Sequence, residues 1–203
     1  MSPKTYKPSQ HTKHNIIQKA LDLFNEYGTA EVSLNSLADA SGISAGNLQY
    51  HYRNKEEIIC AILEIMFTDW NAVYQEMDTE SFTMDTLRRT LRINFNLVWK
   101  YQFFYRELTA LLRNDEILAK RYAAIQEQRL AEQEMLTKQM ARSSEARPMS
   151  QIELRNMVLI GWVLSNSWLS YVESTRRTVD ESVMDEAVEI LIQYYKPYLE
   201  KMT

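Results

Sequence analysis

The sequence is poor in the residues that crosslink, break or bend a chain. Its 203 residues include one cysteine, four glycines and four prolines. A single cysteine, Cys60, excludes an intramolecular disulfide. The scarcity of glycine and proline leaves long uninterrupted stretches, and these stretches lack the apolar–polar alternation of strands. We therefore predict an all-α fold.

Apolar runs of membrane-spanning length are also missing. Residues 157–172 form an uncharged stretch of 16 residues, which contains Ser165, Asn166, Ser167 and Ser170. A membrane-spanning helix needs about 20 mostly apolar residues, so we expect no membrane partner. The first residues are polar and include prolines, unlike a signal peptide. We therefore expect a cytoplasmic protein.

Motifs that carry catalysis or hold a cofactor are lacking too. We find no nucleophile paired with a base, no phosphate-binding loop and no metal cluster. His11 and His14 are three residues apart, but no Cys, Asp or Glu stands near them to complete a metal site. We expect a protein that is not an enzyme and that has neither a cofactor nor a bound metal.

Charge is unevenly distributed along the chain. The net charge of −4 argues against a protein that coats nucleic acid generally. Residues 1–55 nevertheless carry six Lys or Arg against four acidic residues, and the remainder carries the acidic excess. A basic N-terminal segment on an otherwise acidic protein is typical of a protein that binds phosphate groups with one surface. A solvated basic tail without a partner is the alternative.

Residues 33–57, SLNSLADASGISAGNLQYHYRNKEE, indicate two short helices joined by a sharp turn. Ser33 is suited to cap the first helix, and Ser44 to cap the second. Gly42 stands where the turn favours a residue that tolerates positive φ. This is the pattern of a helix-turn-helix, although an ordinary helical hairpin with a solvated polar face has the same features.

The second short helix, residues 45–52, keeps small or polar side chains on its outer face. Leu48 is expected to pack inward, which leaves Gly46 and Tyr50 roughly opposite it. The amides of Asn47 and Gln49 match the donor and acceptor edge of adenine, and Gly46 lets the backbone approach DNA closely. The candidate DNA-binding residues are Ser33, Ser44, Ala45, Gly46, Asn47, Gln49, Tyr50, His51 and Lys55.

Residues 12–59 resemble the DNA-binding domain of the TetR family of bacterial transcriptional regulators. The stretch GISAGNLQYHYRNKEEII carries the resemblance, and the family pattern fits at Gly46, Leu48, His51, Tyr52 and Lys55. Asn47 and Gln49 depart from it, since the family usually has a threonine near the first and, at the second, a tyrosine that contacts phosphate. The resemblance implies a regulator, expected to be a repressor, that binds double-stranded operator DNA as a homodimer and is released by a small-molecule effector.

The periodicity of apolar residues predicts about nine helices in two domains. Residues 1–55 form the helix-turn-helix domain, with a first helix over 12–27 that ends at Gly28. Residues 56–203 form a larger domain for effector binding and dimerisation. A long helix that begins near Lys55 continues into this second domain and links the two. Further helices are predicted over 83–101, 103–113, 115–142, 150–174 and 180–200.

The last two predicted helices have the composition of an interface. Ser150 and Glu153 form a capping box at the start of the first, and residues 157–172 contain no charge. A helix buried on most sides in so small a domain implies a partner, and the apolar stripe of the final helix can supply the other half. In the family, these two helices form the four-helix bundle of the dimer, which the resemblance implies here.

The second domain is rich in aromatic residues, which indicates a cavity for a small apolar or aromatic effector. The candidate ligand-binding residues are Met66, Trp70, Phe95, Trp99, Tyr122, Trp162 and Asn166. Such rings are also common in an ordinary core, so a filled core is the alternative. In function, the corresponding alternative is a DNA-binding protein that has no effector and serves an architectural role.

Overall fold

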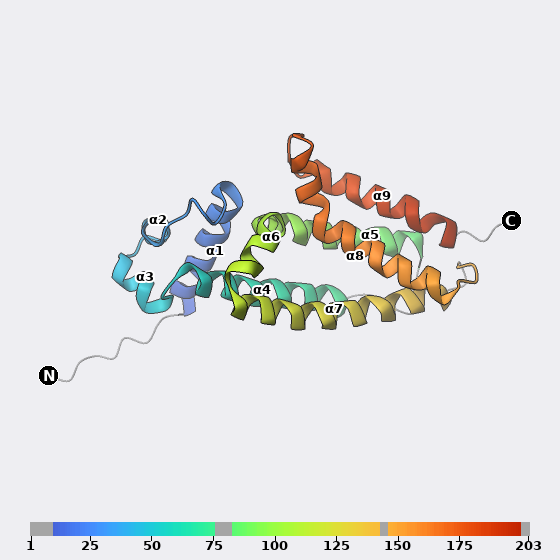
Figure 1. The fold of residues 1–203 in the computed structure, drawn as a ribbon, viewed down its shortest axis with the longest axis horizontal. Coiled ribbons are helices and arrows are strands. Elements are labelled where there is room, and N and C mark those ends of the chain that lie inside the picture. The colour runs from blue at the N-terminus through green and yellow to red at the C-terminus, as the bar shows by residue number, and fades with distance from the viewer. Residues whose placement is uncertain (1–9, 76–82, 143–145, 200–203) are drawn as a thin grey trace. The chain divides into compact units, whose positions relative to one another are not determined.

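The computed structural model describes residues 10–75, 83–142 and 146–199, and these residues form nine helices and no strand (Figure 1). This confirms the predicted all-α fold, and the observed helix ends lie within two residues of the predicted ones. The helices are α1 (Gln10–Tyr27), α2 (Leu34–Ala40), α3 (Ala45–His51), α4 (Lys55–Gln75), α5 (Met84–Lys100), α6 (Gln102–Asn114), α7 (Glu116–Arg142), α8 (Gln151–Ser174) and α9 (Ser182–Leu199).

The chain divides into two compact units, Met1–Ile65 and Met66–Thr203. The sequence-based boundary at residue 55 falls at the start of α4, whereas the structural division falls within that helix. The first turns of α4 bury Ile58, Ile59 and Ile62, so this part of the helix belongs to the first unit. α4 therefore contributes residues to both units without a break.

The first unit has a small apolar core and well-defined helix ends. On α1, the buried residues lie along one face of the helix: Ile16, Ile17, Ala20, Leu21 and Phe24. The Ser33 hydroxyl accepts a hydrogen bond from the Ser36 amide at 3.1 Å and so caps α2. Gly28 ends α1 with φ of 79°, a conformation that only glycine adopts without strain.

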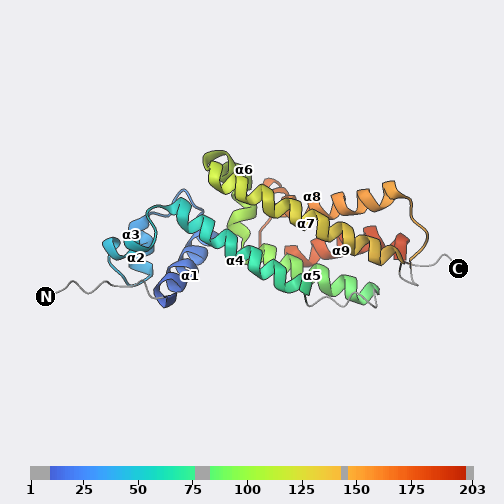
Figure 2. The same ribbon diagram turned by 90° about the horizontal axis from the view of Figure 1, so that it is seen from below.

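In the second unit, α5 packs against α9, while α7 packs against α8 (Figures 1 and 2). Phe95, Phe103 and Phe104 are almost fully buried in its core. The predicted capping box is present at the start of α8, where the Ser150 hydroxyl accepts from the Glu153 amide. No helix in the described ranges combines the length and apolar character that crossing a membrane requires.

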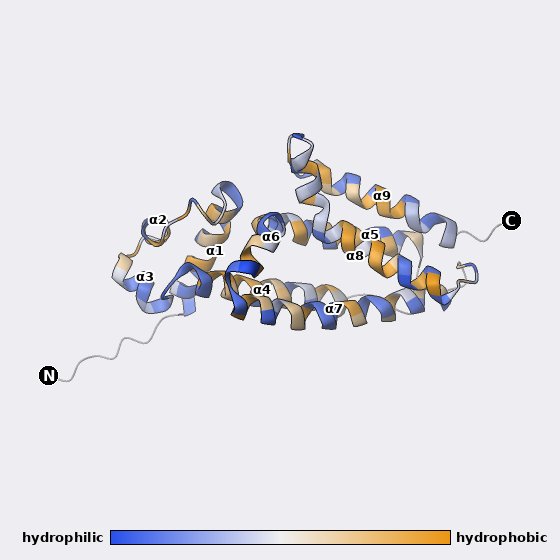
Figure 3. Cartoon of the chain, viewed as in Figure 1, coloured by the Kyte–Doolittle hydropathy of each residue, from blue (hydrophilic) through white to orange (hydrophobic). Residues whose placement is uncertain are grey.

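α8 is apolar over much of its length, as Figure 3 shows, yet within this chain it is buried on one side only. Trp168, Leu169 and Val172 are buried, whereas Val163 on the opposite side has 59% of its surface exposed and Leu159 has 44%. The single chain therefore does not bury this helix on most sides, and its predicted burial against a partner stays a prediction. An apolar face remains open.

Gly161 is the point of close contact between α8 and α9. A Cβ atom at this position would lie 2.7 Å from the Tyr195 hydroxyl oxygen but 3.9 Å from Cζ of the ring. The same hydroxyl donates a hydrogen bond to the Met157 carbonyl at 3.2 Å. The substitution Gly161→Ala would therefore break this bond or push the two helices apart.

We expect Gly161→Ala to lower the free energy of unfolding by about 1–3 kcal/mol, the usual cost of overpacking. In a Tyr195→Phe background the added methyl group fits, because the remaining contact with Cζ has an ordinary length. Urea denaturation of the two single variants and the double variant measures the coupling. If the double variant loses the sum of the two single losses in free energy of unfolding, the Tyr195 hydroxyl does not set the spacing of these helices.

Candidate nucleic-acid interface and ligand cavity

α3 is held in a fixed position by its cap, its core residue and the turn before it. The Ser44 hydroxyl accepts from the Asn47 amide at 3.2 Å, as predicted, and Leu48 is fully buried. Gly42 has φ of 68°, so this turn requires glycine. The Asn15 side-chain amide donates to the Ser41 carbonyl at 2.9 Å and ties the turn to α1. These contacts present one face of α3 to solvent in a defined orientation.

The exposed face of α3 is the face that the sequence predicted. Its exposed residues are Ser44, Ala45, Gly46, Gln49 and Tyr50, and Asn47 is half-buried beside them. Ser33, at the start of α2, is also exposed. The face combines two amides, a phenol and a glycine without any apolar aliphatic side chain larger than alanine. Such a surface can hydrogen-bond to base edges and to phosphates.

Gly46 differs from Gly42 because the backbone conformation at position 46 does not require glycine. A Cβ atom at Gly46 would meet nothing within 4 Å, and its backbone does not have a positive φ. Glycine in a helix costs stability relative to alanine. Neither the packing nor the backbone conformation of the chain therefore requires glycine at position 46.

His51 and Lys55 lie deeper than the sequence suggested. His51 is 8% exposed, neither imidazole nitrogen has a hydrogen-bond partner among the described residues, and its ring meets Tyr50 edge-on at 5.7 Å. Burial, together with the nearby charge of Lys13, lowers the pKa of His51. The Lys55 ammonium donates to the Thr29 carbonyl at 2.5 Å. Direct contacts of His51 and Lys55 with DNA stay predictions.

A cavity of about 40 Å³ lies among α4, α5, α6, α7 and α8 in the second unit. Its lining residues are Met66, Phe67, Trp70, Asn94, Tyr105, Ile125, Gln126, Arg129, Gln133, Trp162, Ser165 and Asn166. Four of the predicted ligand residues, Met66, Trp70, Trp162 and Asn166, are thus brought together. Phe95, Trp99 and Tyr122 do not line this cavity, and their contact with a ligand stays a prediction.

Hydrogen bonds behind the cavity fix Asn166. Its side-chain amide donates to the Trp162 carbonyl at 2.8 Å, and its amide oxygen accepts from the Tyr122 hydroxyl at 3.1 Å. Burial raises the pKa of Tyr122. Tyr122 therefore fixes the position of Asn166, which lines the cavity, without lining the cavity itself. Phe95, with 1% of its surface exposed, is part of the core.

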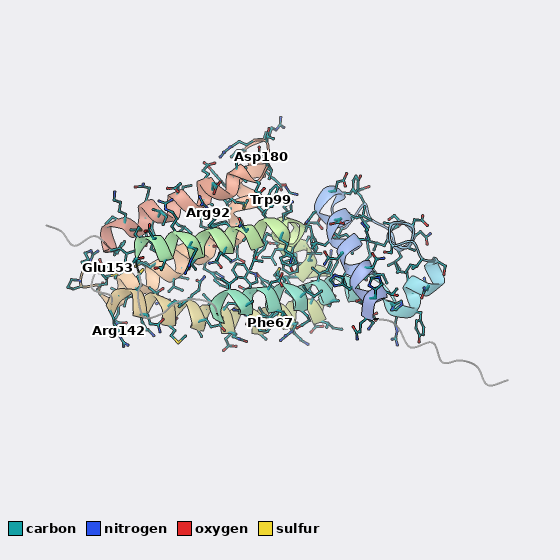
Figure 4. All side chains as sticks on the ribbon, turned by 180° about the vertical axis from the view of Figure 1, so that it is seen from behind. Phe67, Arg92, Trp99, Arg142, Glu153 and Asp180 are labelled. Carbon is teal, nitrogen blue, oxygen red and sulfur yellow. The ribbon has the colours of Figure 1, made fainter. Side chains whose placement is uncertain are left out.

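Arg129 lines the cavity and was missed from sequence. It is 4% exposed, and its guanidinium lies 4.8 Å from the ring centroid of Phe67, which Figure 4 labels on α4. Nη1 donates to the Glu132 carboxylate at 2.6 Å, and Nη2 donates to the side-chain oxygen of Asn71. These partners offset the cost of burying a charge. Arg129 therefore connects α7 to α4 by a hydrogen bond and by stacking.

A second cavity of about 80 Å³ adjoins the first and shares three lining residues with it, Asn94, Gln133 and Ser165. We call these three residues the neck. The far wall of the second cavity is largely apolar and includes Leu91 and Val158. At the neck, the side-chain oxygen of Asn94 is buried and has no hydrogen-bond partner among the described residues.

The open face of α8 and α9 contains a broad depression of about 560 Å³. Its lining residues are Leu159, Ile160, Val163, Leu164, Ser167, Trp168, Tyr171, Glu186 and Ile190. We call this surface the apolar face. Exposed apolar patches of this kind on a folded domain mark interaction surfaces.

Two family models match the chain and together cover most of it. A model described as "Bacterial transcriptional repressor" matches residues 67–202, and one described as "Bacterial regulatory proteins, tetR family" matches residues 16–62. Among characterised relatives, the transcriptional regulator AcrR of Shigella flexneri is 32% identical over 65 residues, which are 32% of this chain and 30% of that protein. The chain spans about a third to a half of the length of the curated relatives it matches.

Solved structures have the same fold over nearly the whole chain. A TetR-family regulator from Marinobacter aquaeolei is 25% identical, with a TM-score of 0.83 over 93% of this chain and 91% of that one. AibR, crystallised with isovaleryl coenzyme A and operator DNA, is 18% identical, with a TM-score of 0.65 over 89% of this chain and 98% of that one. The similarity to AibR shows a shared fold alone.

Proposed function

The chain belongs to the TetR family of bacterial transcriptional regulators, and from this premise we propose that it is a repressor that binds double-stranded operator DNA as a homodimer and is released by a small-molecule effector. The family match confirms the resemblance carried by residues 12–59. The observation that carries the proposal for DNA is the outer face of α3, where Gly46 leaves open space beside exposed polar side chains.

In the proposed complex, α3 lies in the major groove. The amides of Asn47 and Gln49 contact base edges, and Tyr50 and Lys55 contact the backbone. A twofold dimer places two such helices on half-sites one helical turn apart, about 34–36 Å, or farther apart if two dimers share the site. AibR, which has the same fold, was crystallised with operator DNA, and this supports the proposal that the chain binds an operator.

The proposed homodimer forms through the apolar face. Val163 and Tyr171 on α8 and Ile190 on α9 are between 42% and 59% exposed in the single chain. A second copy related by a twofold axis would cover the same residues with their own counterparts. The two helix pairs then form a four-helix bundle, the arrangement that the family resemblance implies.

The proposed effector binds in the cavity beside the second half of α4. Since α4 begins at Lys55 and runs to Gln75, a ligand that moves this helix also acts on the residues that follow α3. The effect cannot exceed the ligand's preference for one dimer conformation over the other. A hundredfold loss of operator affinity needs about 2.7 kcal/mol of coupling, and the operator must weaken ligand binding by the same factor.

Footprinting with genomic fragments tests the DNA-binding proposal and identifies the operator. We expect Tyr50→Ala and Asn47→Ala to weaken specific binding, the latter with relaxed preference at one base pair. Lys55→Ala should weaken binding to all sequences and reduce its salt dependence. Tyr27→Ala is a matched control, because Tyr27 and Tyr50 are both 55% exposed but Tyr27 lies at the end of α1.

Unchanged operator affinity in both Tyr50→Ala and Asn47→Ala, with helicity preserved, would exclude α3 as the reading helix. A loss of the same size in Tyr27→Ala would mean that the variants act through the stability of the domain. Circular dichroism of each variant separates these outcomes from simple unfolding.

An effector-free architectural protein remains the second candidate. The observation that favours it is the small cavity of about 40 Å³, since ligand pockets usually enclose roughly 300–1,000 Å³. Ligand affinity measured with and without saturating operator discriminates between the two functions. Equal affinities for a ligand bound in this domain would favour the architectural role.

A further inference from the structure

The two cavities and the neck between them form a narrow path through the second unit. The first cavity has about 40 Å³ of free space and the second about 80 Å³, so the path has no room for a broad ring system unless the core rearranges. The half-buried Gln133 side chain lines both spaces, as do Asn94 and Ser165. This shape suits a thin, chain-like molecule.

The charge along the path is concentrated at one end. Arg129 is the only charged residue that lines either cavity among the described residues. Its partner Glu132 is on the same helix, and 24% of that side chain is exposed to solvent. In a cavity with little water, a positive guanidinium repels a cationic ligand and attracts an anionic one more strongly than at the surface. A guanidinium also matches a carboxylate in geometry.

The opposite end of the path carries no charge. The second cavity is lined by apolar side chains that include Leu91, Met140 and Val158, together with the hydroxyl groups of Thr90, Thr137 and Tyr195. A molecule with one anionic end and an apolar chain therefore matches the order of the lining residues. The acid group lies at Arg129, and the chain passes the neck into the second cavity.

From this arrangement we propose that the ligand of the second unit is a narrow, chain-shaped carboxylate held by Arg129. This inference rests on the proposed effector function and adds the chemical class of the effector. Because Arg129 also contacts Phe67 and Asn71 on α4, a carboxylate that engages the guanidinium changes the contacts between α7 and α4. The acid group thereby acts on the helix that leads to the DNA-binding unit.

The test compares three eight-carbon probes that differ only in the head group: octanoate, octanamide and octylamine, which is protonated at neutral pH. Isothermal titration of the full chain should give binding of octanoate at least about tenfold tighter than octanamide, because hydrogen bonds to a charged group are roughly twice as strong as neutral ones. Octylamine should bind most weakly. Equal or tighter binding of octanamide would overturn the proposal and would favour the Asn94 oxygen as the anchor.

Substitutions locate the acid group. Arg129→Gln combined with Glu132→Gln removes both charges of the pair, so no carboxylate is left buried alone, and it should abolish the preference for octanoate. Arg121→Gln is the matched control: this exposed guanidinium also lies over Phe67, at 5.3 Å, but does not line the cavity. If the double variant keeps the preference, or if octanoate fails to bind the unmodified chain, the proposal is wrong.

Operator binding measured with the same probes separates this inference from the proposed function. If octanoate binds through Arg129 and leaves operator affinity unchanged, the ligand is a carboxylate as proposed, but the proposal that it releases the operator is wrong. If a neutral or cationic compound binds the cavity and releases the operator while octanoate does not, regulated release holds and the carboxylate assignment fails.

Discussion

The substitution Val163→Glu is expected to convert the protein from a dimer to a folded monomer. Val163 is 59% exposed in the single chain and lies within the apolar face, so the change leaves the chain's own core intact. In the proposed dimer the new carboxylate is buried without a partner, which costs several kcal/mol. Light scattering at micromolar concentration measures the mass, and operator affinity should fall together with dimerisation.

Two other positions on α8 give this experiment its controls. Ile152 is 73% exposed but does not line the apolar face, so Ile152→Glu should leave the dimer intact. Leu169 is only 1% exposed, so Leu169→Glu should unfold the second unit instead of producing a folded monomer. A folded monomer in the unmodified chain at micromolar concentration would contradict the proposed interface.

The substitution Gly46→Leu is expected to preserve the fold and weaken operator recognition. The space in front of Gly46 is open in the free protein, so the side chain fits, but it would occupy the position where DNA approaches α3. We expect operator affinity to fall at least about tenfold, equivalent to 1.4 kcal/mol. The thermal stability of the first unit should stay the same or rise, because glycine is a poor helix former.

Gly42→Ala, in the same motif, is expected to lower stability, whereas Gly46→Leu is expected to lower operator affinity. Gly42 has φ of 68°, and a residue with a Cβ atom pays about 1–2 kcal/mol in that conformation. This variant should therefore lose stability first and operator affinity only as a consequence. If Gly46→Leu also unfolds the domain, or if it binds the operator normally, the open space has no role in recognition.

The sequence predicted the features of this protein that depend on neighbours along the chain. The caps at Ser33, Ser44 and Ser150 are present because each hydroxyl needs only the amide three residues later. Helix ends were predictable for the same reason. The outer face of α3 also followed from helical periodicity once Leu48 was assigned to the core.

Features that depend on distant residues were not predictable from such patterns. The bond from Lys55 to the Thr29 carbonyl joins positions 26 residues apart, and the burial of His51 depends on the packing around it. Aromatic content alone did not separate Trp162, which lines the cavity, from Phe95, which fills the core. Arg129 did leave a signal, because it interrupts the otherwise apolar stripe of Tyr122 and Ile125 on α7.

The open space at Gly46 and the division into two units have a genetic consequence. The residues proposed to read DNA belong to the first unit, and those proposed to pair the chains belong to the second. A missense allele at codon 46 would therefore yield chains that still assemble with normal ones. In a cell that carries both alleles, mixed dimers would hold one competent reading helix and one blocked one. Such an allele would be dominant over the normal copy, whereas a null allele would be recessive.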